Sequence, residues 1–384
     1  MKKDCSRRQF ISALGGAAAG FWLSPPGMCL AGRTPTAPVS VARCRAYGPE
    51  VLATLESMFD QLGGLEQLAK GKTVAVKLNL TGPALQRLGH QPPELTHWVH
   101  PQVIAATVHL LGKAGARRIR LLESPMSTAE AVEEFMLQAN WEPRDFTSAA
   151  AGVEFENTNY LGKGKKYSRL WVPGGGLLFK AYDVNHSYED CDVFVSVAKL
   201  KEHASAGVTL SMKNSFGITP CTIYGDDAGE DEPSELPRGG RGILHRGQRQ
   251  PSRSAPSEND PRSPREDGYR VPRAVADLAA ARPIHLAILD GIESMAGGEG
   301  PWIPGCRPVR PGLLIAGRNC VTTDAVATAL MGFDPMAERG APPFEHCDST
   351  LRLAEQLGVG TRDLRRIEVL GTPIAKARSD FRSL

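Results

Sequence analysis

Three consecutive stretches decide the fold, beginning with Thr73-Val-Ala-Val-Lys-Leu-Asn79. This stretch is short and rich in β-branched residues, which is typical of a strand. Residues 101–114 start with Pro101 and end before Gly115, as helices commonly do. Residues 118–122 again have the character of a strand. The order strand, helix, strand predicts a βαβ unit on a parallel sheet.

Further segments on both sides repeat this alternation. Residues 192–197 are almost wholly apolar, which is typical of a central strand that is buried on both faces. By the same criteria we expect helices at 50–70, 129–138, 321–330 and 349–357, and strands at 39–44, 177–182, 284–290, 312–316 and 367–370. The predicted fold class is α/β, with a mainly parallel sheet of the doubly wound type flanked by helices.

Residues 222–270 differ from the rest of the chain in composition. They are dense in proline, glycine, serine, arginine and acidic residues and contain few apolar ones. Because such a segment can bury little apolar surface, we expect a long disordered insertion in the α/β domain. A lid over a binding site is the alternative interpretation, since long loops are often functional.

The N-terminus has the features of an export signal. Residues 6–11, Ser-Arg-Arg-Gln-Phe-Ile, precede an apolar stretch at 10–23 that is too short to span a bilayer comfortably. The paired arginines resemble a twin-arginine translocation signal. We therefore expect the twin-arginine translocation machinery to recognise the chain and the protein to be periplasmic or otherwise exported. After removal of the signal we expect no stable membrane span. A plain secretory signal is the alternative.

The predicted organisation of the chain follows from these observations. We expect a signal peptide at 1–31, a linker with an N-terminal strand and helix at 32–72, an α/β domain at 73–372 and a polar tail at 373–384.

The formal net charge of +3 is concentrated in the predicted signal, which contains four basic residues and one acidic residue. The remaining chain is formally neutral, and this disfavours nucleic-acid binding through a generally basic surface. Six of the eight cysteines follow the signal, so disulfides are permitted in an exported protein, although buried thiols are the favoured interpretation. No Cys-x-x-Cys occurs, so the spacing does not support an iron–sulfur cluster.

Polar residues follow the predicted strands, at the positions where α/β proteins bind ligands. Lys77 and Asn79 share one face of their strand and suit an anion, although Lys77 alone could simply reach solvent. His100 precedes a helix and could bind an anionic substrate or cap that helix.

Two lysine-containing segments follow the apolar strand at 192–197. Lys199, Lys201 and His203 emerge directly from it, and burying them requires anionic partners or lowered pKa values. Lys213 and Asn214 lie in an apolar run compatible with a helix. A solvated loop is the alternative for the first segment.

Three carboxylates in the last third of the chain are candidate metal ligands. Asp290 ends a strand, Glu299 lies in a glycine-rich loop, and Asp324 begins a helix. Together they could hold a hard divalent metal. Asp324 could equally cap its own helix, which is the favoured interpretation for that residue.

In this order, the motifs resemble those of the DUF362 family. The matching segments are Lys77/Asn79, His100-Pro101, Lys199/Lys201/His203, Thr209 to Gly217, Asp290 to Pro301 and Val321/Asp324/Ala325, and they extend over residues 75–372. The family is one of unknown function, so the resemblance implies a fold and a site. Cysteine motifs of the ferredoxin type, which some members carry, are missing here.

The sequence predicts a single composite site with divided roles. Lys199, Lys201, His203 and Lys213 are expected to be catalytic, Lys77, Asn79, His100 and Asn214 to bind substrate, and Asp290, Glu299 and Asp324 to hold a metal. The predicted function is an exported enzyme acting on a small anionic substrate. A non-catalytic binding protein for an anionic ligand or a redox cofactor is the alternative, and a purely structural ion network is a third.

Overall fold

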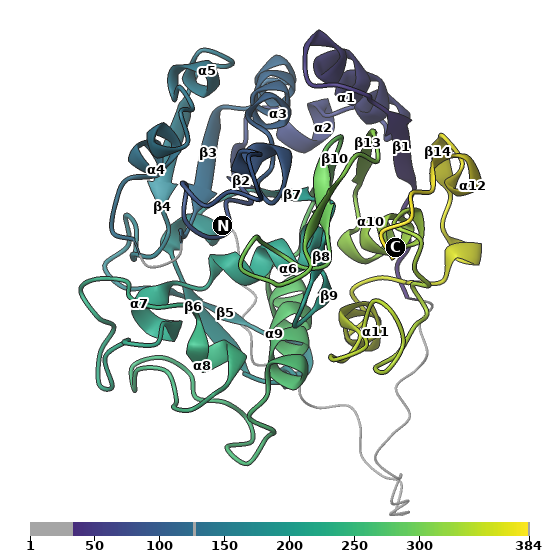
Figure 1. Cartoon of the computed structure of the whole chain (residues 1–384). Coiled ribbons are helices and arrows are strands. Elements are labelled where there is room, and N and C mark those ends of the chain that lie inside the picture. Colours follow the sequence, from purple (N-terminus) through teal and green to yellow (C-terminus); the bar gives the residue numbers. More distant parts are fainter. Residues whose placement is uncertain (1–33, 126–127, 383–384) are drawn as a thin grey trace, which may run out of the picture. The chain divides into compact units, whose positions relative to one another are not determined.

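A computed structural model describes residues 34–125 and 128–382 of the chain, so the predicted signal at 1–31 lies outside the described residues (Figure 1). The main sheet of this part has eight strands in the order β14-β1-β13-β10-β7-β2-β3-β4. Its strands are β1 (Val39–Arg43), β2 (Thr73–Lys77), β3 (Arg118–Glu123), β4 (Val153–Asn157), β7 (Val193–Lys199), β10 (Leu286–Gly291), β13 (Leu313–Gly317) and β14 (Val369–Gly371).

Short two-stranded antiparallel sheets accompany the main sheet. They pair β5 (Ser168–Trp171) with β6 (Ala181–Val184), β8 (Glu202–His203) with β9 (Gly207–Val208), and β11 (Ser294–Ala296) with β12 (Arg307–Val309). The helices are α1 (Pro49–Gln61), α2 (Glu66–Ala69), α3 (Pro101–Lys113), α4 (Val132–Gln138), α5 (Arg144–Thr147), α6 (Leu210–Ser215), α7 (Cys221–Tyr224), α8 (Gly242–His245), α9 (Asp267–Ala281), α10 (Cys320–Leu330), α11 (Thr350–Gln356) and α12 (Ile374–Ala377).

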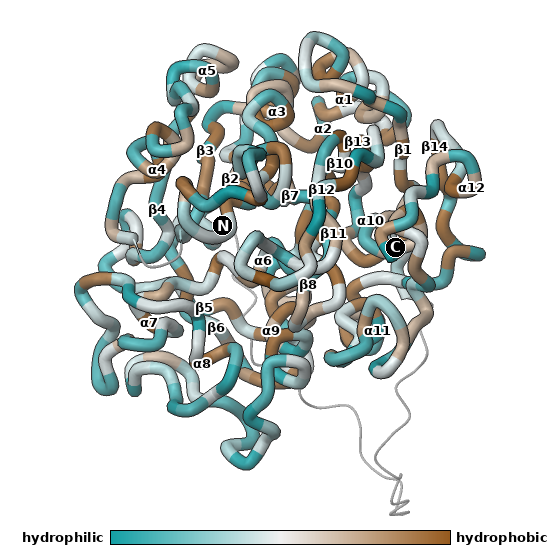
Figure 2. The backbone as a smooth tube through the Cα atoms, in the orientation of Figure 1, coloured by the Kyte–Doolittle hydropathy of each residue, from teal (hydrophilic) through white to brown (hydrophobic). Residues whose placement is uncertain are grey.

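The predicted fold class is confirmed. Most neighbouring strands are parallel, including β2 with β3, β2 with β7, and β7 with β10. Only β13 runs against both of its neighbours among the described strands, β1 and β10, so the sheet is mixed. The apolar side chains of the strands alternate between two cores, one under α1 and α3 and one under α6, α9 and α10. Figure 2 shows the hydrophobic colour concentrated along the strands of the main sheet.

The strand order reverses between β2 and β7. From β2 the chain proceeds outward to β3 and β4, whereas β7 and β10 are added on the opposite side of β2. In parallel sheets, ligands bind in the crevice at the carboxyl ends of the strands beside such a reversal. The topology therefore brings the residues that follow β2, β3, β7 and β10 to one edge of the sheet.

The segment 222–270 differs from the prediction of disorder. It is irregular but packed, with Ile223, Tyr224, Ile243 and Leu244 all buried. The buried carboxylate of Glu258 also joins it to the start of α9, through ion pairs with Arg265 (2.5 Å) and Arg270 (2.6 Å). Composition did not reveal this order, because ion pairs and a few well-placed apolar residues replace a continuous apolar pattern.

The C-terminal segment predicted as a polar tail also contains structure. It forms the short helix α12, and Ala377 and Phe381 are buried. The described residues include no helix that is both long enough and apolar enough to cross a membrane. In the same part of the chain the cysteines are free thiols, namely Cys44, Cys191, Cys221, Cys306, Cys320 and Cys347.

Candidate functional site

A cavity of about 640 Å³ lies at the carboxyl ends of β2, β3 and β7, a volume typical of small-molecule sites. We call it the Lys213 cavity. Six of the predicted site residues line it, namely Lys77, Asn79, His203, Lys213, Asn214 and Glu299. Its lining does not include Lys199, Lys201, His100, Asp290 or Asp324. The predicted composite site is thus divided, with one part in the cavity and one outside it.

Lys77 is buried in the cavity wall, and its ammonium is bound to acceptors of the protein. Its ammonium donates to Glu123 Oε1 (2.5 Å) and to the Leu78 carbonyl (2.6 Å). The second carboxylate oxygen of Glu123 accepts from the Leu80 N–H at 2.9 Å. Burial lowers the pKa of Lys77, and the Glu123 charge opposes this effect. Lys77 and Glu123 therefore form a closed pair that joins the ends of β2 and β3.

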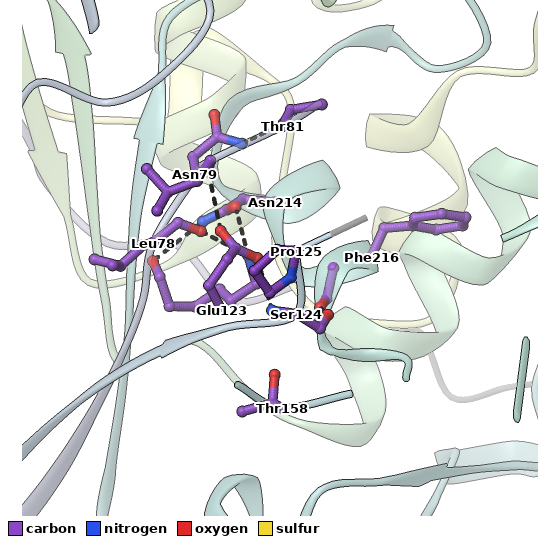
Figure 3. Close-up of polar contacts among 12 residues, drawn as sticks. Leu78, Asn79, Thr81, Glu123, Ser124, Pro125, Thr158, Asn214 and Phe216 are labelled. Atoms are coloured by element: carbon purple, nitrogen blue, oxygen red, sulfur yellow. Dashed lines mark hydrogen bonds and ion pairs between the residues drawn. The ribbon is translucent and has the colours of Figure 1, made fainter. Parts of the chain in front are cut away.

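The two predicted substrate-binding amides also bind the protein itself. Asn79 Oδ1 accepts from the Lys199 backbone N–H (3.1 Å), and its Nδ2 donates to Thr81. Asn214 Nδ2 donates to Ser196 Oγ at 3.0 Å, and Asn214 lies beside Glu123 and Ser124 in Figure 3. These contacts fix the strand ends relative to α6, so both amides shape the cavity.

Lys213 is the cation in this cavity that lacks a direct partner. Within the described residues its ammonium has no hydrogen-bond acceptor and no carboxylate within ion-pair distance, and it lies 4.1 Å from the centre of the Phe216 ring. Burial lowers its pKa to about 7, with Glu299 opposing the shift and Arg241 and Lys77 adding to it. A lysine of this kind can exchange a proton near neutral pH.

His203 and Glu299 lie together at another part of the cavity wall. His203 Nδ1 accepts from the Ser205 N–H (3.2 Å), so the neutral ring carries its proton on Nε2. Burial lowers the pKa of His203 well below its usual value. Glu299 accepts from the Ala204 N–H (2.9 Å) and the Trp302 indole (3.1 Å). Burial opposes its ionisation, but His203 and these donors outweigh burial and lower its pKa to about 2.

Lys199 belongs to a separate polar cluster, which we call the Lys199 network and which consists of Tyr47, His100, Lys199 and Asp290. Lys199 and Asp290 are opposite each other in the register of β7 and β10, and their charged groups are 2.8 Å apart. Tyr47 OH donates to Asp290 Oδ1 at 3.0 Å, and Lys199 also donates to the Glu94 carbonyl. Both charges are fully buried and paired within the protein.

His100 is part of the same network and does not line the cavity. Its backbone N–H donates to Asp290 Oδ2 (2.9 Å), while its Nδ1 accepts from the Gln102 N–H and so caps α3. The ring stacks on Tyr47 with centroids 3.5 Å apart. Burial lowers the pKa of His100 to about 4. In the structure, His100 therefore acts as a helix cap and stacking partner.

Lys201 lies between the two regions. Its ammonium donates to the carbonyl oxygens of His97 (2.8 Å) and Glu299 (2.7 Å), and burial lowers its pKa to about 7. It thereby attaches the glycine-rich loop around Glu299 to the segment that precedes α3. Its contacts fit a positioning role better than direct contact with a substrate.

Asp324 caps a helix other than its own. It accepts from the N–H groups of Ser211 (3.0 Å) and Met212 (2.9 Å) in the first turn of α6, which carries Lys213. Asn319 caps α10 instead. Burial raises the pKa of Asp324 to about 7.

The three predicted metal ligands do not come together. Asp290 is paired in the Lys199 network, Glu299 lines the cavity, and Asp324 caps α6. Across residues 34–125 and 128–382, no three His, Cys, Asp or Glu side chains are grouped so that they could hold a metal ion.

The insertion contributes a cavity residue that sequence reasoning missed. Arg241 lines the cavity, as do His245, Arg246 and Asp226 from the same segment. Several other arginines occur in this charged stretch, and none has a motif or an apolar period around it. Only the position of the segment over the sheet edge distinguishes Arg241 from them.

The chain belongs to the DUF362 family, described as a domain of unknown function, whose profile matches residues 74–329. It is 25% identical over 307 residues to a thylakoid-associated protein of Synechocystis sp., with 77% of this chain and 75% of that protein covered. A crystal structure of a Thermotoga maritima protein aligns with 66% of the chain at 14% identity and a TM-score of 0.35. The alignment spans about half of that protein, 52% of its length.

Proposed function

We propose that this protein is an enzyme that acts on a small anionic molecule bound in the Lys213 cavity, with Lys213 as the acid–base group. The observation that carries the proposal is the unpaired ammonium of Lys213 in a cavity of about 640 Å³. Lys77 and Lys199 are paired with carboxylates, whereas Lys213 has no such partner among the described residues.

The acid–base role follows from the surroundings of Lys213. A group whose pKa lies near the working pH populates both protonation states and can accept or donate a proton efficiently. Burial brings Lys213 into this range, with a pKa of about 7. The charged form attracts an anion on entry, and the neutral amine is available as a base.

His203 and Glu299 give the cavity a fixed hydrogen-bonding wall. Since Nδ1 of His203 accepts from the Ser205 N–H, the neutral ring presents Nε2–H as a donor. Glu299 is held by two N–H donors and stays ionised, which keeps a negative charge near Lys213 and limits the fall of the lysine pKa. We assign His203 to substrate orientation.

Export forms a second part of the proposal. The support is the paired arginines and apolar stretch of residues 6–23. A fusion of residues 1–31 to a reporter that requires the twin-arginine pathway tests it, with Arg7→Lys/Arg8→Lys as the control. Transport that persists unchanged in the control contradicts the assignment.

Identifying the substrate and replacing Lys213 tests the enzymatic proposal. Native mass spectrometry of the purified protein, followed by a thermal-shift screen of small anions, identifies candidates. For a compound that the protein converts, Lys213→Met is expected to lower turnover about 10²–10⁴-fold while cooperative unfolding is retained. Undiminished turnover in that variant excludes Lys213 as the acid–base group. Tight binding of an unconverted ligand supports the alternative, a binding protein.

A further inference from the structure

Arg241 reaches the cavity from a segment that lies outside the sheet. It precedes α8 in the stretch 222–270 and lines the cavity together with Lys213. Asp226 helps to shape the turn before it, since its Oδ2 accepts from the Gly240 N–H at 2.8 Å. The turn also contains Gly239 with a φ of 65°, a conformation that glycine adopts without strain.

The guanidinium of Arg241 is held in one orientation by neutral oxygen atoms. Nε donates to Thr219 O (2.7 Å) and Oγ1 (3.0 Å), and Nη2 donates to Ser124 O (3.1 Å), Ser124 Oγ and Gly217 O (3.3 Å). These groups lie after β3 and α6. Five hydrogen bonds to carbonyl and hydroxyl oxygens fix the group without neutralising it.

The positive charge of Arg241 has no counter-ion in the part of the chain that the structure describes. No carboxylate of these residues lies within 4.0 Å of its nitrogens, and Nη1 has no hydrogen-bond acceptor among them. The acidic residues nearby are engaged elsewhere, since Asp226 accepts from Gly240 and Asp267 lies beside His245 and Arg246.

Arg241 and Lys213 act on the same space. Both line the same cavity, and the charge of Arg241 also helps to lower the Lys213 pKa. Both also contact one turn of the chain, because Lys213 lies over the Phe216 ring and Arg241 binds the next carbonyl, that of Gly217. Arg241 and Lys213 each keep N–H donors that have no acceptor among the described residues. Two such cations side by side can bind an oxyanion, whose oxygens carry several lone pairs.

We propose that Arg241 Nη1 and the Lys213 ammonium bind the same oxyanion, a carboxylate or phosphate group of the substrate, so that segment 222–270 determines specificity. This inference rests on the proposed function and adds the substrate class. Phe216 and Trp302 also line the cavity and offer aromatic surface to an apolar part of the substrate. Ser124, which also lines the cavity, is a positioning residue because its carbonyl and hydroxyl oxygens accept from Arg241.

The test compares three probes that share one apolar ring. Benzoate, phenyl phosphate and uncharged benzyl alcohol are titrated into the full protein, with binding followed by NMR. Wild type is expected to bind at least one of the two anions, and to bind benzyl alcohol at least about tenfold more weakly than that anion. The anion that binds more tightly shows whether the site prefers a carboxylate or a phosphate. Equal binding of benzyl alcohol, or no saturable binding of either anion, overturns the proposal.

Variants separate this inference from the function it rests on. Arg241→Gln is expected to weaken anion binding at least about tenfold, and Ser124→Ala less. Arg253→Gln is the matched control, because this exposed arginine of the same segment pairs with Asp231 at 2.9 Å and does not line the cavity. If Lys213→Met abolishes binding while Arg241→Gln binds like wild type, the role of Arg241 is wrong and the cavity proposal stands.

The opposite result is equally informative. If Arg241→Gln weakens binding and Lys213→Met does not, Arg241 holds the anion and the role of Lys213 fails. Arg241→Lys keeps the charge but loses the planar fork, so a folded Arg241→Lys protein with recovered binding shows that charge alone accounts for the effect. That recovery overturns the part of the proposal that assigns the site to Nη1.

Discussion

The Lys199 network and the Lys213 cavity place their lysines in opposite electrostatic situations. Lys199 is wholly buried and lies 2.8 Å from the carboxylate of Asp290, with Tyr47 and a carbonyl completing its contacts. Lys213 is partly buried and lines a cavity, and its ammonium has no acceptor among the described residues. Burial alone therefore does not indicate a catalytic lysine, and the counter-ion is what distinguishes the two.

The largest expected effect concerns the paired lysine. Lys199→Met leaves the buried carboxylate of Asp290 without its cation and should lower the free energy of unfolding by about 3–5 kcal/mol. Urea denaturation measures this loss. Adding Asp290→Asn to the same protein removes the unpaired charge and should recover part of it. A loss no larger than that of the exposed control Lys70→Met would show that the pair is not structural.

The second prediction concerns how the free energy of unfolding depends on pH with and without Lys213. Folded Lys213 has a pKa of about 7, below the ordinary 10.5, so above pH 7 the unfolded state retains a proton that the folded state has released. The free energy of unfolding of wild type therefore rises with pH across this interval. Lys213→Met lacks this contribution, so it should be more stable than wild type below about pH 7, by an amount that shrinks as the pH rises.

Paired denaturation curves of wild type and Lys213→Met between pH 6 and 10 provide the measurement. Lys201 titrates in both proteins, and because the Lys213 charge contributes to lowering the pKa of Lys201, the difference also contains this smaller coupling. A stability difference that stays constant with pH would mean that Lys213 keeps an ordinary pKa in the folded protein.

The smallest expected effect is a shift in one titration. Glu299 raises the pKa of Lys213 against the effect of burial, so Glu299→Gln should move the pKa of Lys213 below about 7. NMR observation of the labelled lysine side chain follows this shift. Lys70 is the internal reference, because it is exposed and its pKa is raised by its hydrogen bond with Glu66. An unchanged titration of Lys213 would place Glu299 outside its electrostatic surroundings.

The sequence was sufficient for the architecture and for the edge of the sheet where the cavity lies. The β-branched run at 73–79 and the apolar run at 192–197 are β2 and β7, and the residues that follow them point to one edge. Periodicity detects such elements because side-chain burial repeats along each strand.

The division of the polar residues into two regions could not be predicted in this way. Lys199 and Lys213 look alike in sequence, and only the pairing of β7 with β10 places Asp290 beside one of them. The partner of Asp324 is a helix distant in the chain, so the expectation that it caps its own helix was wrong. Arg241 depends on the packing of a charged segment, which composition indicated to be disordered.

The attachment of segment 222–270 by the Glu258 ion pairs has an evolutionary consequence. The segment is also held from its middle, where Arg241 binds Thr219, Ser124 and Gly217. The parts between these contacts can change in length and composition while the eight-stranded sheet and the lysine on α6 stay as they are. Ligand preference could then diverge between relatives through this stretch alone, without a new fold and without loss of the lysine to which we assign acid–base chemistry. Exchanging the stretch between homologues is accordingly a direct route to altered selectivity.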